Sequence, residues 1–167
     1  MTITDHVGEG RVLTEAALVE QVAADRASGR TFVFANGCFD VLHVGHVRYL
    51  TGAAAEGDRL IVAVNDDASV RGLKGPSRPV QAADDRAALV AALRVVDYVV
   101  VFSDPDVERL LTLLRPEVHC KGSDYTVETV PERRVVQAYG GRTVIVGDNK
   151  DHSTRDVIAR ILAGEGV

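Results

Sequence analysis

The chain has 167 residues, of which 46% are hydrophobic and 26% are charged, and its formal net charge is −5. This length and composition are typical of one globular domain over residues 1–167, and the negative balance argues against a general nucleic-acid binder. No apolar run approaches the roughly 20 residues that a membrane helix needs, and the polar start lacks the apolar core of a signal peptide. We therefore expect a cytoplasmic protein with no nucleic-acid or membrane partner.

The first part of the chain predicts a covering helix followed by a strand, helix and strand. Residues 1–12 are expected to form a mobile extension, and Thr14 is placed to cap a helix that ends near Ser28. Apolar patterns then predict a strand over 31–36, a helix over 43–56 and a strand over 58–65. The segment 66–79 has glycines, prolines and basic residues without apolar periodicity, so we expect a loop there.

The second part continues the alternation of helices and strands. The predicted elements are a helix over 82–94, a strand over 97–102, a helix with Asp104 as N-cap and Pro105 at N1, a strand over 117–122, a helix over 131–139, a strand over 142–147 and a last helix opened by Ser153. In the third of these, Val107, Leu110, Leu111 and Leu114 share one helix face. The alternation predicts an α/β fold, a Rossmann-like doubly wound parallel sheet of five strands in the order 3-2-1-4-5.

Polar residues follow the predicted strands at the points where ligands bind in open parallel sheets. The first strand is followed by NGCFDVLHVGH (36–46), and later loops carry Lys74, Lys121 and Ser153. The hypothetical strand order brings His43, His46 and Lys121 to one crevice. There is no GxxxxGK[ST] loop and no GxGxxG after the first strand, which excludes the two commonest nucleotide-binding motifs.

His43 and His46 stand three residues apart at a predicted helix start, and three readings are open for them. A helix N-terminus attracts anions, and Gly37 and Gly45 permit close approach of a phosphate to the backbone. The same dipole would keep the histidines mostly neutral until a polyphosphate arrives. Alternatively, they are structural residues, or they bind zinc together with Cys38 or Asp40.

Other candidates have ordinary explanations as well. Ser153 and Thr154 suit a helix cap with Asp156 or a phosphate contact. Lys74, Arg78 and Lys121 would be solvated charges if their loops did not converge. Asp85 and Arg86 belong to a helix start, with a ligand role for Arg86 equally open. Cys38 and Cys120 are too few for a disulfide framework, and their positions at strand ends suit small apolar fillers.

The stretches NGCFD and HVGH resemble the HxGH signature of the nucleotidyltransferase superfamily, which includes the cytidylyltransferases and pantetheine-phosphate adenylyltransferase. LIVAVNDD, LKGPSRPV, the helix start at Arg86, VDYVVVF and KGSDYTVETVPE together resemble the heptose 1-phosphate adenylyltransferase family, over residues 13–163. Many members of that family carry a fused sugar kinase, for which this length leaves no room, so the chain is similar to the stand-alone transferase.

The resemblance implies transfer of AMP from ATP to D-glycero-β-D-manno-heptose 1-phosphate, with magnesium arriving on the nucleotide and Asp40 as its protein contact. It implies a homodimer as well. The implied catalytic residues are His43, His46 and Lys74. The implied nucleotide-binding residues are Asn36, Gly37, Cys38, Phe39, Asp40, Gly45, Lys121, Gly122, Ser153 and Thr154. The implied substrate-binding residues are Asn65, Arg78, Arg86, Asp124 and Tyr125.

The chain departs from the family pattern at one element. Related transferases read G-x-S-T-T before the last helix, whereas this chain reads DHSTR, with His152 before the serine and Arg155 in place of the second threonine. Arg155 could add a phosphate contact or change the nucleotide or sugar preference. The competing functions are a cytidylyltransferase that makes CDP-glycerol and a non-catalytic nucleotide-binding protein of the same fold.

Overall fold

The computed structural model describes residues 10–147 and 153–164, in which six parallel strands form one sheet in the order β1-β4-β3-β2-β5-β6. The strands are β1 (Arg11–Val12), β2 (Phe32–Gly37), β3 (Arg59–Asn65), β4 (Tyr98–Phe102), β5 (Val118–Gly122) and β6 (Arg142–Val146). The prediction of five strands is wrong, because Arg11–Val12, which was assigned to a mobile extension, pairs with Tyr98 and Val99. Residues 1–9 lie outside the described residues. The five longer strands lie in the order β4-β3-β2-β5-β6.

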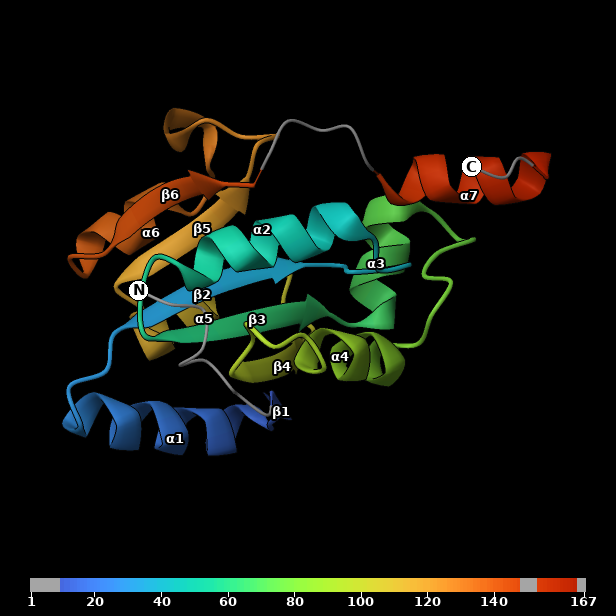
Figure 1. The fold of residues 1–167 in the computed structure, drawn as a ribbon. Coiled ribbons are helices and arrows are strands. Elements are labelled where there is room, and N and C mark those ends of the chain that lie inside the picture. The colour runs from blue at the N-terminus through green and yellow to red at the C-terminus, as the bar shows by residue number, and fades with distance from the viewer. Residues whose placement is uncertain (1–9, 148–152, 165–167) are drawn as a thin grey trace.

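Helices cover both faces of the sheet (Figure 1). One apolar cluster joins the sheet to α2 (Val44–Ala54) and α4 (Ala83–Ala91), and a second joins it to α1 (Glu15–Ala27), α5 (Glu108–Leu114) and α6 (Arg133–Ala138). In β2, Phe32 and Phe34 belong to the second cluster and Val33 and Ala35 to the first. This alternation buries both sides of the strand, which explains why the run Phe32–Ala35 is apolar at every position.

Several predicted helix ends are confirmed by their caps. The Thr14 side chain accepts a hydrogen bond from the Ala17 N–H at 3.3 Å, and α1 ends at Ser28 as expected. Ser153 caps α7 (Thr154–Ala163) by accepting from the Asp156 N–H at 3.2 Å. These caps satisfy backbone donors that have no partner inside the helix.

Two predicted elements are corrected by the structure. The expected loop over 66–79 contains α3 (Asp67–Lys74), because Asp66 caps the Ser69 N–H at 2.7 Å and Val70 packs into the core. The helix predicted to begin at Asp104 begins at Glu108 instead. Asp104 pairs with Arg109 at 2.7 Å, and Asp106 accepts from the Glu108 N–H at 2.9 Å. The N-cap is Val107, three residues later than expected.

The connections between the strands bring the loops after β2 and β5 together at one edge of the sheet. The chain runs from β2 to β3 on one side of the sheet and from β5 to β6 on the other, so the strand order reverses between β2 and β5. Figure 1 shows α3 and α7 beyond the carboxyl ends of β2 and β3. Ligands of open parallel sheets bind at such a reversal of strand order. Among the helices of the described ranges, none is long and apolar enough to cross a membrane.

Candidate active site

A pocket of about 800 Å³ lies at the carboxyl ends of the strands. It is lined by the loops after β2, β3, β5 and β6 and by the starts of α2 and α7. Of the candidate site residues, the structure brings the following to this pocket: Asn36, Gly37, Cys38, Phe39, Asp40, His43, Gly45, His46, Asn65, Lys74, Arg78, Lys121, Gly122, Asp124, Tyr125, Ser153 and Thr154. Arg86 does not line it.

His43 and His46 form a reciprocal cap at the start of α2. The His43 Nδ1 accepts from the Gly45 N–H at 3.1 Å, and the His46 Nδ1 accepts from the His43 N–H at 3.3 Å. Their ring centroids lie 3.9 Å apart. Because each Nδ1 is an acceptor, a neutral ring carries its proton on Nε2, which is then a hydrogen-bond donor. The structural and phosphate readings of this motif are therefore compatible, since the helix start uses Nδ1 and a phosphate contact would use Nε2.

The protonation state of His46 agrees with that assignment. Burial, and after it the neighbouring His43, lower the pKa of His46 to about 4. His46 is thus neutral near pH 7, as expected, but its burial is the main cause. The zinc reading has no support within residues 10–147 and 153–164, where no group of three histidine, cysteine or acidic side chains is placed to hold a metal ion.

The turn between β2 and α2 has a strained backbone. Phe39 and Val41 adopt positive φ values of 48° and 55°, which are uncommon for residues other than glycine and especially for a β-branched side chain. Between them, the buried Asp40 carboxylate accepts hydrogen bonds from Arg78 Nε at 2.6 Å, from the Val80 N–H at 2.9 Å and from the Gln81 N–H at 3.1 Å. Asp40 therefore holds the strained turn against the loop after α3.

These contacts engage the carboxylate to which a magnesium contact was assigned. Burial alone would raise the pKa of the Asp40 carboxyl, but the Val80 and Gln81 N–H groups and Arg78 outweigh burial and lower it. Both carboxylate oxygens already accept hydrogen bonds, and the residue is 2% exposed. An ion in the pocket would have to displace the partners of Asp40, so the residue is a clamp between two loops.

Arg86 is a second link among the loops of the pocket, and the structure places it outside the pocket lining. The side chain is fully buried and donates to the Cys38 carbonyl, to the Gln81 carbonyl at 2.9 Å and to Asp67 at 2.9 Å. From the sequence, Arg86 was expected at a helix start after a long loop. That position does not show whether the side chain faces a ligand or the protein interior. It fixes the turn after β2 relative to α3 and α4.

The β5 side of the pocket carries a buried polar network. Lys121 Nζ donates to Asn36 Oδ1 at 3.1 Å and to Glu132 Oε1 at 3.1 Å, and it lies 5.5 Å from the centre of the Tyr125 ring. His119 Nε2 lies 3.2 Å from the same Asn36 oxygen, so in its neutral form it donates there. With its oxygen occupied by two donors, the Asn36 amide has its NH₂ group left for other partners.

Acid should destabilise the protein through its buried histidines. Burial, and after it the charge of Lys121, lower the pKa of His119 from the ordinary 6.5 to about 3. The unfolded chain therefore binds protons that the folded chain does not, so the contribution is complete above about pH 6.5 and is lost as the pH falls towards 4. The loss approaches about 1.4 kcal/mol per pH unit for each such histidine.

Urea unfolding of the wild type and His119→Gln at several pH values checks this expectation. The wild type should lose more stability than the variant between about pH 6.5 and 4.5, because the variant has one buried histidine fewer. Parallel stability profiles for the two proteins would show that folding does not lower the pKa of His119.

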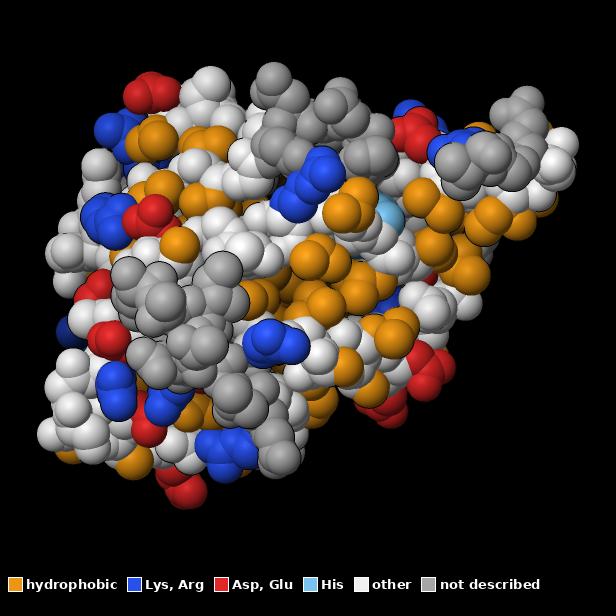
Figure 2. Space-filling model, viewed as in Figure 1, with side chains coloured by type: hydrophobic (Ala, Val, Ile, Leu, Met, Phe, Trp, Pro, Cys, Tyr) orange, Lys and Arg blue, Asp and Glu red, His pale blue; other side chains and the backbone are white. Residues whose placement is uncertain are grey.

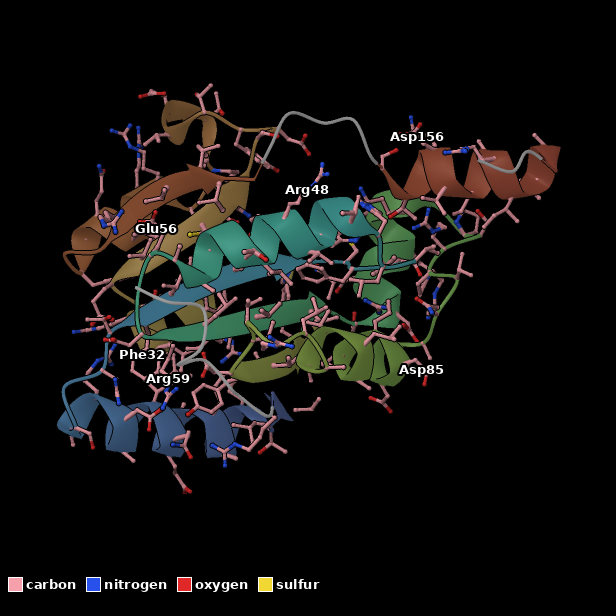
Figure 3. All side chains as sticks on the ribbon, viewed as in Figure 1. Phe32, Arg48, Glu56, Arg59, Asp85 and Asp156 are labelled. Atoms are coloured by element: carbon pink, nitrogen blue, oxygen red, sulfur yellow. The ribbon has the colours of Figure 1, made fainter. Side chains whose placement is uncertain are left out.

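The start of α7 closes the remaining side of the pocket. Thr154 Oγ1 donates to the Asp40 carbonyl at 2.8 Å, which ties α7 to the turn before His43. Asp156 stands at the beginning of the helix (Figure 3), where its carboxylate accepts from the Ser153 hydroxyl at 2.6 Å. Ser153 and Asp156 therefore form the helix cap, which was one of the two roles considered for Ser153, the other being a phosphate contact. Both residues also line the pocket. His152 lies outside the described residues.

The sequence reading missed several lining residues: Tyr49, Leu73, Ser123, Val146 and Gly147. Tyr49 follows His46 by three residues on one helix face, a spacing that would have indicated it. Its hydroxyl donates to the Cys120 carbonyl at 2.8 Å, joining α2 to β5. Gly147 has a φ of 92°, which permits the chain to turn away directly after β6.

An α/β sheet with a polar pocket at its strand-order reversal and a histidine-capped helix start facing that pocket defines a Rossmann-like nucleotide-handling protein. The profile of the cytidylyltransferase-like family matches residues 34–161. The chain belongs to this family, and the expected nucleotidyltransferase fold is confirmed.

Curated relatives and a solved structure agree with the family. The chain is 48% identical over 153 residues to the bifunctional protein HldE of Ectopseudomonas mendocina and 45% identical over 159 residues to that of Geobacter sulfurreducens. The alignments cover 92% and 95% of this chain but 32% of each relative, so the chain spans about a third of their length. A crystal structure of the lipopolysaccharide core biosynthesis protein from Thermoplasma volcanium covers 73% of this chain and 100% of its own, with a TM-score of 0.63 and 27% identity.

Proposed function

We propose that this chain transfers AMP from ATP to D-glycero-β-D-manno-heptose 1-phosphate, which yields ADP-heptose and pyrophosphate. The observation that carries the proposal is a single pocket that joins the His43–His46 helix start to Lys74 and to the polar network at β5. The acceptor follows from the resemblance over residues 13–163. The similarity to HldE proteins and to a lipopolysaccharide core biosynthesis protein supports the same choice.

The reaction is a direct in-line displacement at the α-phosphorus. An oxygen of the sugar phosphate forms a bond to this atom while the bond to the β-bridging oxygen breaks, and the electron pair leaves with pyrophosphate. No covalent intermediate is needed, so catalysis rests on alignment and on stabilising the charge that develops on the leaving group. In this pocket His46 Nε2–H, the positive end of α2 and the Lys74 ammonium would supply that stabilisation.

Magnesium would lower the charge of the triphosphate and come with it. Within the described residues no cluster of acidic or histidine side chains forms a cage, which suits an ion that keeps several waters and binds chiefly to phosphate oxygens. The chain's own task is then to bind the nucleotide through the turn after β2 and the α7 start, and the sugar phosphate through Asn65, Arg78, Asp124 and Tyr125.

The proposal is tested by pyrophosphate release with a panel of substrates. ATP and CTP are each combined with heptose 1-phosphate and with glycerol 3-phosphate. We expect release with ATP and heptose 1-phosphate at a rate at least about tenfold above every other combination, because a pocket built for one substrate leaves polar groups unpaired with another. Release only with CTP and glycerol 3-phosphate would favour the rival cytidylyltransferase. Nucleotide binding without any release would favour the non-catalytic protein.

We also propose that the protein acts in the cytoplasm as a homodimer. Ile161 and Leu162 on α7 are 68% and 82% exposed, and Figure 2 shows hydrophobic side chains gathered along the visible side of this helix. Exposed apolar side chains of this kind are typical of contact surfaces. Light scattering during size-exclusion chromatography gives the mass, and a monomer at micromolar concentration would exclude the dimer.

A further inference from the structure

The cationic side chains that line the pocket differ in how their charge is compensated. Arg78 lies 2.6 Å from Asp40 and Lys121 lies 3.1 Å from Glu132, and both side chains are largely buried. Each of these cations is therefore neutralised by a carboxylate of the protein. A polyphosphate would gain less from them than from a cation whose charge is uncompensated.

Lys74 and Arg155 are the opposite case. Both line the pocket, both are exposed, and neither has an ion pair with a carboxylate within the described ranges 10–147 and 153–164. They come from different elements, since Lys74 ends α3 and Arg155 belongs to the first turn of α7. Among the described residues, the cations of the pocket without a carboxylate partner thus come from two sides.

The position of Arg155 within α7 is locally unfavourable. It is the second residue of the helix, where the free N–H groups and the helix dipole already place positive charge. The acidic residue of the first turn, Asp156, is held by the Ser153 hydroxyl as part of the cap. An anion bound at this end of the pocket would make the position of Arg155 favourable. Residues that are locally unfavourable in this way are expected at functional sites.

The anchoring of α7 indicates which anion this is. Thr154, the neighbour of Arg155, donates to the Asp40 carbonyl in the turn that leads to His43. Arg155 therefore belongs to the histidine end of the pocket, to which the proposed function assigns the triphosphate, and not to the Lys121 end. We propose that Arg155, which replaces the second threonine of the family element, binds the β- and γ-phosphates opposite Lys74. This inference rests on the proposed function.

Substitution of Arg155 by the threonine of the family element tests the inference. Binding of ATP and of AMP, each with magnesium, is measured by calorimetry on the wild type, Arg155→Thr and Arg155→Lys. We expect the dissociation constant of ATP to rise about tenfold in Arg155→Thr, as for loss of one charge-assisted hydrogen bond, and that of AMP to stay within about twofold. Arg155→Lys should recover part of the ATP affinity, because it restores the charge but not the guanidinium fork.

The matched control is Arg160→Thr, which removes an arginine from the last turn of the same helix and outside the pocket lining. It should leave ATP binding unchanged and slightly lower the melting temperature, since a cation is favourable there. Arg155→Thr should leave the melting temperature of the ligand-free protein equal or slightly higher. A loss of ATP affinity together with an equal or higher melting temperature would not result from a merely structural role of Arg155. If Arg155→Thr does not fold, Arg155→Gln serves for the same comparison.

Three results would overturn the inference: equal losses for ATP and AMP, unchanged ATP binding with a raised KM for the sugar phosphate, or a changed ratio of ATP to CTP affinity. Each would assign Arg155 to another part of the substrates. The binding measurement needs no acceptor, so it is separate from the proposed reaction. If the substrate panel shows another nucleotide in use, the same comparison of triphosphate with monophosphate decides the role of Arg155.

Discussion

His46→Ala is expected to lower kcat by about two to three orders of magnitude, the usual effect of removing one positioned donor to developing charge. The neutral His46 ring carries its proton on Nε2, while Nδ1 accepts from the His43 N–H. Its loss should affect kcat more than ATP affinity, because the charge on the leaving pyrophosphate exists chiefly in the transition state. The substitution also removes half of the cap of α2, which should cost about 1 kcal/mol of stability.

His46→Gln separates the two roles of this residue. A glutamine at the third helical position can accept from the backbone N–H of the capping residue, as in an ordinary capping box. The variant should therefore unfold near the wild-type urea midpoint and still be nearly inactive. Wild-type turnover in His46→Gln would show that the imidazole is needed only to build the helix start.

Asp40→Asn is expected to lower the free energy of unfolding by about 3 kcal/mol, in the range for breaking a buried charge pair. The Asp40 carboxylate holds Arg78 and two backbone N–H groups, and an amide would present its own donors to some of them. Release of this clamp frees the strained turn at Phe39 and Val41. Turnover should fall as well, because that turn leads directly to His43.

The control for Asp40→Asn is Asp58→Asn. Asp58 also accepts two hydrogen bonds, from the Thr31 N–H at 2.9 Å and the Thr31 hydroxyl at 2.8 Å, but its side chain is 34% exposed and lies outside the pocket lining. Its loss should cost less than about 1 kcal/mol and leave turnover unchanged. The magnesium concentration for half-maximal activity should be the same in Asp40→Asn and the wild type. A large increase of this magnesium concentration in Asp40→Asn would show that Asp40 is a magnesium contact.

Elements with long apolar patterns could be predicted from the sequence, and short elements held by a few contacts could not. The runs Phe32–Ala35 and Leu60–Val64 are apolar at every position because both sheet faces are covered, and both were recognised as strands. β1 has two residues and no pattern of its own, so only its pairing with β4 defines it. α3 buries Val70 alone, which leaves no periodicity to detect, although Asp66 and Ser69 were a readable cap.

The site was predictable to the extent that its residues follow strands. Loops at the carboxyl ends of parallel strands must converge, and all the candidates on those loops line one pocket. What side chains do within such loops depends on packing that the sequence does not display. Arg86 is buried among carbonyls, Asp40 is fully engaged by Arg78 and two N–H groups, and the two histidines cap each other as well as face the pocket.

The central claim, transfer of a nucleotidyl group, is tested most directly by following the label of ATP. The protein is incubated with magnesium, heptose 1-phosphate and ATP radiolabelled at either the α- or the γ-phosphorus, and the products are separated. The account predicts that the α-label appears in the sugar nucleotide and the γ-label in pyrophosphate. Transfer of the γ-label to the sugar, or release of the γ-label as inorganic phosphate without a sugar nucleotide, would contradict it.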